Sequence, residues 1–275
     1  MKTGKETIIK PISGWHALDL AEIWQYRELL YFFTWRDLKV RYKQTAIGVA
    51  WAIFQPFLTM VVFTIFFGQF AKIPSEGVPY PIFVYCGLLL WQFFASSLTD
   101  ISNCMISNQS IVTKVYFPRL LLPMSYILTN FIDFLIASSV LIALMVYYGF
   151  VPHLSGLLIF PLLLIITFAS SAGLGLLLAS INVKYRDVRY VLPYFIQLLL
   201  FVSPVIYPAS ILGQYTWLLA LNPMAGVIST ARAVLFGLTS ISWLSLGFSF
   251  VTALALFFAG TFSFKRAESY FADIV

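Results

Sequence analysis

The stretch WRDLKVRYKQTAIGVAWAIFQPF, residues 35–57, changes from basic to apolar within one segment. Arg36 and Arg41 lie in its first half, and no charged residue follows Lys43 until Lys72. A basic cluster directly before a long apolar run is typical of the cytoplasmic end of a transmembrane helix. The stretch therefore predicts an integral membrane protein whose N-terminal segment lies in the cytoplasm.

The composition of the 275-residue chain indicates the same class. The chain is 60% hydrophobic and 10% charged, whereas a soluble domain carries about 25% charged residues. Its net charge of +6 comes from basic residues that flank apolar runs, so the charge indicates topology rather than nucleic-acid binding. A secreted enzyme, a nucleic-acid reader and a disordered chain are excluded. Cys86 and Cys104 lie in apolar runs, where we expect small buried side chains.

Six apolar runs are long enough to cross a bilayer, which takes about 20 residues. The sequence therefore predicts an all-α protein with six transmembrane helices. They span residues 47–70, 80–105, 120–150, 154–181, 189–207 and 243–264. In the fourth, Ser171, Gly175 and Ala179 are four residues apart, which favours close helix packing.

Residues 208–242 form an apolar segment that is interrupted by glycines and by the Asn222–Pro223 pair. With six spans and both termini in the cytoplasm, 15 of the 17 Lys and Arg residues lie inside. A seventh span would move the C-terminal basic pair outside, against the positive-inside rule. The segment is therefore expected to be a re-entrant hairpin on the outer side. A pair of helices lying on the surface is the alternative.

The N-terminal region, residues 22–45, predicts a helix in the cytoplasmic membrane interface. It is rich in Trp, Tyr and Phe, and Arg36, Lys39 and Lys43 share one helical face. Such a helix lies with its aromatic side in lipid and its basic groups among phosphates. It serves either as a topological anchor or as a docking surface for a cytoplasmic partner. The chain then divides into a cytoplasmic segment 1–45, a transmembrane domain 46–265 and a tail 266–275.

Two cytoplasmic loops are further candidates for contact with a partner. The loop SNQSIVTKVYFPRLLLP, residues 107–123, predicts a short helix with an exposed apolar tip, which usually marks an interaction site. The tip comprises Val115, Tyr116 and Phe117 beside Lys114 and Arg119. The loop NVKYRDVR, residues 182–189, is the second candidate. Aromatic residues at headgroup level, and charges that only set topology, are the alternatives.

Ionisable residues are sparse in the predicted spans. Asp133 lies deep in the third, and Asp100 lies toward the inner end of the second. Such groups are costly in a membrane and are functional candidates. Since no basic partner lies on a neighbouring span, Asp133 is expected to form hydrogen bonds in packing or in a channel. Aromatic stripes at Trp51, Phe54 and mid-span phenylalanines offer sugar C–H groups an apolar surface.

Motifs of catalysis are absent from the sequence. It has no G-x-x-x-x-G-K-[ST] loop for ATP, no paired membrane carboxylates and no nucleophile elbow. The sequence therefore gives no reason to expect an enzyme, or a cofactor bound by this chain.

The blocks WRDLKVRYKQTAIGVAWAIFQPF, SNQSIVTKVYFPRLLLP, INVKYRDVRYVLPY, SPVIYP and LNPM together resemble ABC-2 type permeases that export polysaccharides such as O-antigen, capsule and teichoic acid. The resemblance covers residues 22–264, and the first block is the most specific. It implies a homodimer in the bacterial cytoplasmic membrane with two copies of a separate ATPase that binds ATP and Mg²⁺. It also implies an undecaprenyl-linked polysaccharide as substrate, most specifically O-antigen.

The resemblance also implies roles for individual residues. Those of the substrate path are Trp51, Phe54, Phe57, Phe93, Phe94, Asp133 and Tyr194. Those that dock the ATPase are Arg36, Lys39, Lys114, Val115, Tyr116, Phe117, Arg119, Lys184, Tyr185, Arg186 and Asp187. Those of the outer gate are Pro204, Pro208, Asn222, Pro223 and Arg232.

Other functions are open on the sequence alone. An ABC-2 exporter of teichoic acid, capsule, a drug or a lipid is the nearest. An ion-coupled carrier would depend on Asp133 and need no ATPase. A membrane-embedded glycosyltransferase or acyltransferase would need a clustered acid–base or metal site, for which only Asp100 and Asp133 are available.

Overall fold

The computed structural model of the chain describes residues 20–43, 48–151, 154–185, 187–237 and 241–274. Within these ranges all regular secondary structure is helical, as the sequence predicts. Five helical segments in the described residues are long and apolar enough to cross a membrane, and they coincide with five of the six predicted spans. They are α3 (Ala50–Phe63) continued by the π-helix η1 (Thr64–Phe70), α4 (Tyr80–Ser107), α6 (Leu121–Tyr148), α7 (Leu154–Lys184) and α10 (Trp243–Ile274).

The predicted fifth span, residues 189–207, is only partly helical. The helix α8 (Val188–Val202) has 15 residues, which is about 22 Å and falls short of a hydrocarbon core of about 30 Å. At Ser203 the backbone becomes extended, with ψ 143°. The cause is Pro204, because a proline disfavours the helical conformation at the preceding residue. The helix therefore ends before the predicted boundary.

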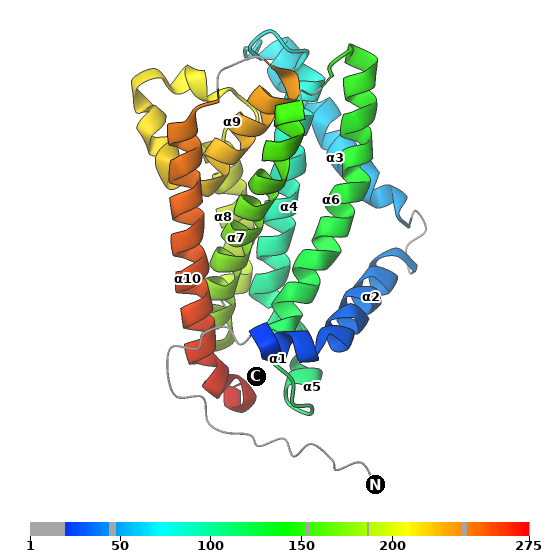
Figure 1. Cartoon of the computed structure of the whole chain (residues 1–275), viewed down its shortest axis with the longest axis vertical. Coiled ribbons are helices and arrows are strands. Elements are labelled where there is room, and N and C mark those ends of the chain that lie inside the picture. The colour runs from blue at the N-terminus through cyan, green and yellow to red at the C-terminus, as the bar shows by residue number, and fades with distance from the viewer. Residues whose placement is uncertain (1–19, 44–47, 152–153, 186, 238–240, 275) are drawn as a thin grey trace.

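The interrupted segment 208–242 contains two short helices. They are η2 (Ala209–Leu221), a 3-10 helix with a kink at Gly213, and α9 (Pro223–Phe236). Asn222 separates them and caps α9, because its side chain accepts a hydrogen bond from the Met224 amide at 3.0 Å. Figure 1 shows both helices at one end of the bundle. Two helices are present where the hairpin was predicted, and their depth in a membrane stays a prediction.

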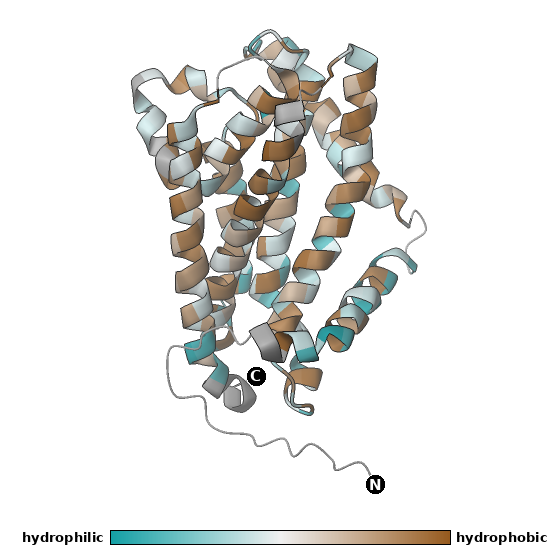
Figure 2. Ribbon diagram, in the orientation of Figure 1, coloured by the Kyte–Doolittle hydropathy of each residue, from teal (hydrophilic) through white to brown (hydrophobic). Residues whose placement is uncertain are grey.

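The opposite end of the bundle carries α1 (Leu20–Gln25), α2 (Arg27–Lys43) and α5 (Gln109–Val112) (Figure 1). The end of α10 lies there too, and α10 continues without a break past the predicted tail boundary. Hydrophilic residues gather on α2 and at this end, whereas hydrophobic residues cover the long helices (Figure 2). The positive-inside rule expects charge at a cytoplasmic end, but the cytoplasmic location of this end and the interface role of α2 stay predictions.

The long helix α4 forms the centre of the bundle. It is contacted by five helices, α3, α6, α7, α8 and α9. In its most apolar stretch of 18 residues, 83% of the residues are buried. Pro81 lies in its first turn, where a missing amide proton costs no helical hydrogen bond. Cys86 and Cys104 are both enclosed on this helix, which confirms the prediction that they are buried.

Small residues bring α7 close to its neighbours. A Cβ on Gly175 would lie 2.8 Å from the side chain of Ile101 on α4, so the predicted small-residue face does pack closely. The tightest approach is elsewhere, between Gly173 of α7 and Gly260 of α10. A Cβ on Gly260 would lie 1.9 Å from the Gly173 carbonyl oxygen. The contact between α7 and α10 therefore requires glycine at this crossing.

Candidate functional site

A cavity of about 600 Å³ lies between α2, α3, α4, α6 and α8. Its walls include the aromatic, amide and hydroxyl side chains of Trp51, Gln55, Gln92, Phe93, Ser96 and Thr99. Aromatic rings present an apolar face to sugar C–H groups, and amides and hydroxyls both donate and accept hydrogen bonds. The cavity therefore has the chemistry of a surface that contacts carbohydrate.

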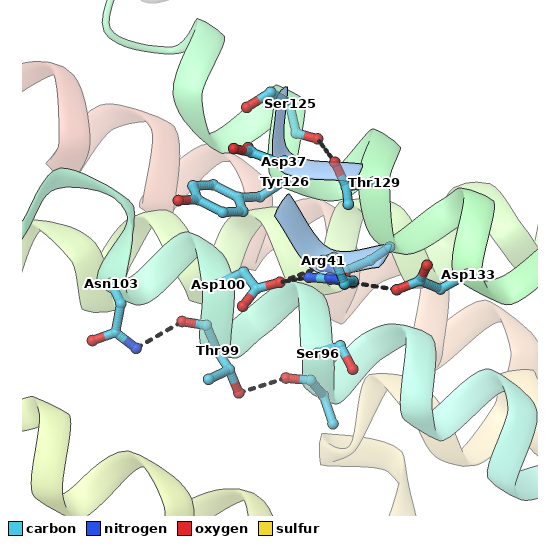
Figure 3. A network of polar contacts seen from close by, with 12 residues as sticks. Asp37, Arg41, Ser96, Thr99, Asp100, Asn103, Ser125, Tyr126, Thr129 and Asp133 are labelled. Atoms are coloured by element: carbon cyan, nitrogen blue, oxygen red, sulfur yellow. Dashed lines mark hydrogen bonds and ion pairs between the residues drawn. The ribbon is translucent and has the colours of Figure 1, made fainter. Parts of the chain in front are cut away.

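The end of the cavity near α2 carries an ionic cluster. Arg41 of α2 places Nη2 3.0 Å from Asp100 Oδ2 on α4, and its Nη1 donates to Asp133 Oδ2 on α6. Nη1 also donates to Asn130 Oδ1 at 2.9 Å, and Asn130 Nδ2 donates to Asp100 at 2.9 Å. The Tyr42 hydroxyl donates to Asp133. Figure 3 shows the Arg41 guanidinium between the two carboxylates.

The cluster corrects the expectation that Asp133 has no basic partner. The partner comes from the interface helix α2 and not from a neighbouring span. Burial would lower the pKa of Arg41, but the charges of Asp133 and Asp100 outweigh it and raise that pKa above its usual value. Burial and the hydrogen bond to Asp133 raise the pKa of Tyr42. At neutral pH Arg41 is therefore charged and Tyr42 is protonated.

The predicted substrate-path residues separate into three groups. Those that line the cavity are Trp51, Phe93 and Asp133. Those that are exposed on α3 and α8 but lie outside the cavity lining are Phe54, Phe57 and Tyr194. Phe94 is the third case: its side chain is 2% exposed and packs against Trp91. It lies in the core and not on the cavity, because α4 is surrounded by other helices.

The predicted docking loop presents a smaller apolar tip than expected. Val115 and Tyr116 are exposed, as predicted. Phe117 is 4% exposed and packs edge-to-face on Phe33 of α2, with 5.5 Å between ring centroids. The expectation that Phe117 is exposed is therefore wrong, because its ring completes the contact between the loop and α2.

The other docking candidates differ in their exposure. The exposed ones are Lys39, Lys114, Lys184, Tyr185 and Asp187. Arg36 instead donates to Asn108 Oδ1 at 2.9 Å, and Arg119 donates to the carbonyl of Glu268. Arg186 lies outside the described residues. A docking role for these residues stays a prediction.

Arg232, assigned to the outer gate, is buried inside the bundle. It donates to the carbonyls of Phe83 at 3.1 Å, Pro204 at 2.7 Å and Val205 at 2.6 Å. Its guanidinium lies 3.6 Å from the centroid of the Phe83 ring. Since Pro204 and Val205 directly follow α8, Arg232 ties α9 both to the end of α8 and to α4.

The other predicted gate residues are also enclosed or half-enclosed. Pro204, Pro208 and Asn222 are buried, and Asn222 Nδ2 donates to Ser203 Oγ at 2.8 Å. Pro223 is half-buried at the start of α9. The exposed large side chains of η2 are Ile211, Tyr215, Trp217 and Leu221. The named residues thus hold the segment together, and different residues face its surroundings.

Sequence reasoning missed Arg41, Tyr42 and Asn130 as members of the ionic cluster. The available signal was charge balance, because carboxylates in apolar helices require a cation nearby. That cation lies outside the spans, on the adjoining basic helix α2, which carries Arg41.

Comparison with known proteins places this arrangement in a family. Residues 28–236 match the family described as ABC-2 type transporter. An O-antigen export system permease protein RfbA of Myxococcus xanthus is 31% identical over 78% of this chain and 83% of its own length. One of Klebsiella pneumoniae is 29% identical over 90% of this chain and 95% of its own length. The polysialic acid transport protein KpsM of Escherichia coli is 26% identical, over 85% and 91%. The chain belongs to the ABC-2 type transporter family.

Proposed function

We propose that this chain is the membrane-spanning permease subunit of an ATP-driven exporter of O-antigen polysaccharide. The observation that carries the proposal is the aromatic and amide-lined cavity between α3, α4 and α6. It occurs in a chain that is about 30% identical, over most of its length, to proteins named O-antigen export permeases. The membrane helices and the family match support the transport role.

The charge of the cavity indicates which part of the substrate it contacts. The end of the cavity near α2 holds one guanidinium, that of Arg41, which is already bonded to two carboxylates. Arg41 is the one cation among the described lining residues, and its pairing with the carboxylates leaves no second cation there for a phosphate. The cavity therefore accepts the sugar units of an undecaprenyl-linked polysaccharide, and the diphosphate of the lipid stays outside it.

A two-fold assembly of the chain is part of the proposal. The helix α3 is poorly covered, and Trp51, Phe54, Leu58 and Val62 form an exposed stripe along it. One protomer encloses too little space for a polymer, and most homo-oligomers are closed by a two-fold axis. A second copy that faces this stripe extends the aromatic cavity into a conduit.

The partner that supplies energy is a cytoplasmic ABC ATPase in two copies, which carries ATP and Mg²⁺. Exposed Lys114, Val115 and Tyr116 at the same end as α2 support docking there. In this arrangement both termini are cytoplasmic, α8 acts as a short sixth span, and η2 with α9 forms the outer hairpin. The protein then lies in the bacterial cytoplasmic membrane.

The proposal is tested by co-expression with the ATPase encoded beside this chain, followed by purification through a tag on the permease. We expect a stable complex that hydrolyses ATP and moves O-antigen glycolipid across reconstituted vesicles. A chain that binds no ATPase in several detergents, or a complex that moves no glycolipid, contradicts the proposal.

A second candidate substrate is a capsular polymer such as polysialic acid, because a polysialic acid transport protein is 26% identical over most of this chain. Polysialic acid carries a carboxylate on every sugar, and the one cation among the described lining residues, Arg41, is already paired with two carboxylates. Parallel transport assays with neutral O-antigen and with polysialic acid separate the two candidates.

A further inference from the structure

The two halves of α2 are attached to the bundle in different ways. Its buried residues, Phe33 and Thr34, both lie in the first half, where Phe33 packs on Phe117. The second half, residues 35–43, contains no buried side chain. It is attached instead by the polar contacts of Arg36, Arg41 and Tyr42.

Arg36 and Arg41 connect α2 to two different places. Arg36 bonds to Asn108, which lies within the docking loop directly before α5. Arg41 bonds to Asp100 and Asp133 at the end of the cavity near α2. The two arginines are five residues apart, which is about 7.5 Å along a helix. One short rigid element therefore links the docking loop to the cavity.

Polar contacts can be exchanged for water, and buried apolar contacts cannot. The side chains of Arg41, Asp100 and Asp133 are 35%, 27% and 24% exposed, so water reaches them. Partly exposed ion pairs can exchange their partners for water, whereas buried apolar surface resists separation. The second half of α2 can therefore leave the bundle while Phe33 holds the first half in place.

We propose that Arg41 is a positioning residue for transport. Its ion pairs with Asp100 and Asp133 hold the second half of α2 over the end of the cavity that Arg41 and Tyr42 line. Force on the docking loop, transmitted through Arg36 and Asn108, withdraws that half and admits substrate. This inference rests on the proposed function for the ATPase that supplies the force.

The test measures access to the cavity from the cytoplasmic side. Ser96, on the cavity wall, is replaced by Cys, and the complex with its ATPase is placed in inside-out vesicles. The native Cys86 and Cys104 are buried, so labelling by a membrane-impermeant maleimide reports position 96. We expect slow labelling without nucleotide and a rate about tenfold higher with a non-hydrolysable ATP analogue. In Arg41→Gln we expect fast labelling in both states.

Two further variants separate positioning from loss of charge. Lys43→Gln removes one positive charge from the same helix at an exposed position, and it is expected to label like the wild type. The double variant Arg41→Asp with Asp133→Arg keeps one cation and two carboxylates in the cluster. We expect it to restore slow labelling without nucleotide, because the ion pair is re-formed with its members exchanged.

Several results would overturn the proposal. One is slow labelling in Arg41→Gln without nucleotide; another is fast labelling in an assembled charge-exchange variant. If Arg41→Gln does not assemble, Asp133→Asn takes its place, since it leaves the Arg41–Asp100 pair and should raise labelling by a smaller factor. Failure of every variant to assemble would make the cluster a requirement of folding and end the proposal.

Labelling requires no glycan, so the two proposals fail separately. Nucleotide-dependent labelling without O-antigen transport leaves the positioning role and rejects the substrate. Transport of O-antigen per ATP hydrolysed that is unchanged in Arg41→Gln, with labelling still slow, leaves the substrate and rejects the positioning role.

Discussion

The guanidinium of Arg232 lies 3.6 Å above the ring of Phe83 and donates to the Phe83 carbonyl at 3.1 Å. The contact joins α9 to the first turn of α4, although the residues are 149 positions apart. It makes Arg232 a structural clamp at the end of the bundle that carries η2 and α9.

The first prediction concerns this clamp. Arg232→Met keeps the length of the side chain and removes its donors, so the carbonyls of Pro204 and Val205 lose their partner. We expect the free energy of unfolding to fall by about 2–4 kcal/mol. The measurement is a lower Tm, determined by size-exclusion chromatography after heating. The control is Lys72→Gln, which removes an exposed cation and should leave Tm unchanged. Equal Tm values in both variants would refute the clamp.

The second prediction concerns the crossing of α7 and α10. Gly260→Ala places a methyl group against the Gly173 carbonyl and should cost about 1–3 kcal/mol. Gly247→Ala lies on the same helix with nothing within 4 Å of its added Cβ, and it should be neutral or stabilise by up to about 1 kcal/mol. Thermal unfolding in detergent compares the two variants. A Gly260 variant as stable as the Gly247 variant would show that this crossing can relax.

The third prediction concerns ATPase docking. Tyr116→Asp places a charge on the exposed apolar tip, and we expect affinity for the ATPase to fall about tenfold or more. Phe117→Ala should instead lower Tm, because its ring packs on Phe33. Tyr147→Asp, an exposed tyrosine on α6 far from the tip, serves as the control. Unchanged ATPase binding in the Tyr116 variant would remove the tip from the docking surface.

The fourth prediction concerns the cavity wall. Trp51→Ala removes an aromatic face that lines the cavity, and we expect O-antigen export to slow about fivefold, the equivalent of one aromatic contact. Trp243→Ala removes an exposed tryptophan outside the cavity lining and should leave export unchanged. Export is measured in vesicles with the amount of permease matched. A loss of export equal to the loss of protein yield would mean that Trp51 only packs.

The sequence was sufficient to predict the long helices and the end of the bundle at which charged residues gather. Long apolar runs form helices in a membrane because each backbone amide must be bonded within its own segment. The basic block before α3 marks that end by charge alone. The sequence also contains the signal that ends α8, because Pro204 follows Ser203, although the predicted span continued to residue 207.

Tertiary structure decided which side chains meet. The sequence identified Asp133 but not its partner, because Arg41 reaches it from a helix that lies outside the spans. Phe94 was assigned to the substrate path and Phe117 to an exposed tip, yet both side chains are buried, and Phe117 packs on Phe33 from a distant segment. Periodicity specifies the faces of a helix, whereas burial and ion pairing depend on which other helix covers each face. That information is distributed over residues far apart in the chain, so only the folded arrangement reveals it.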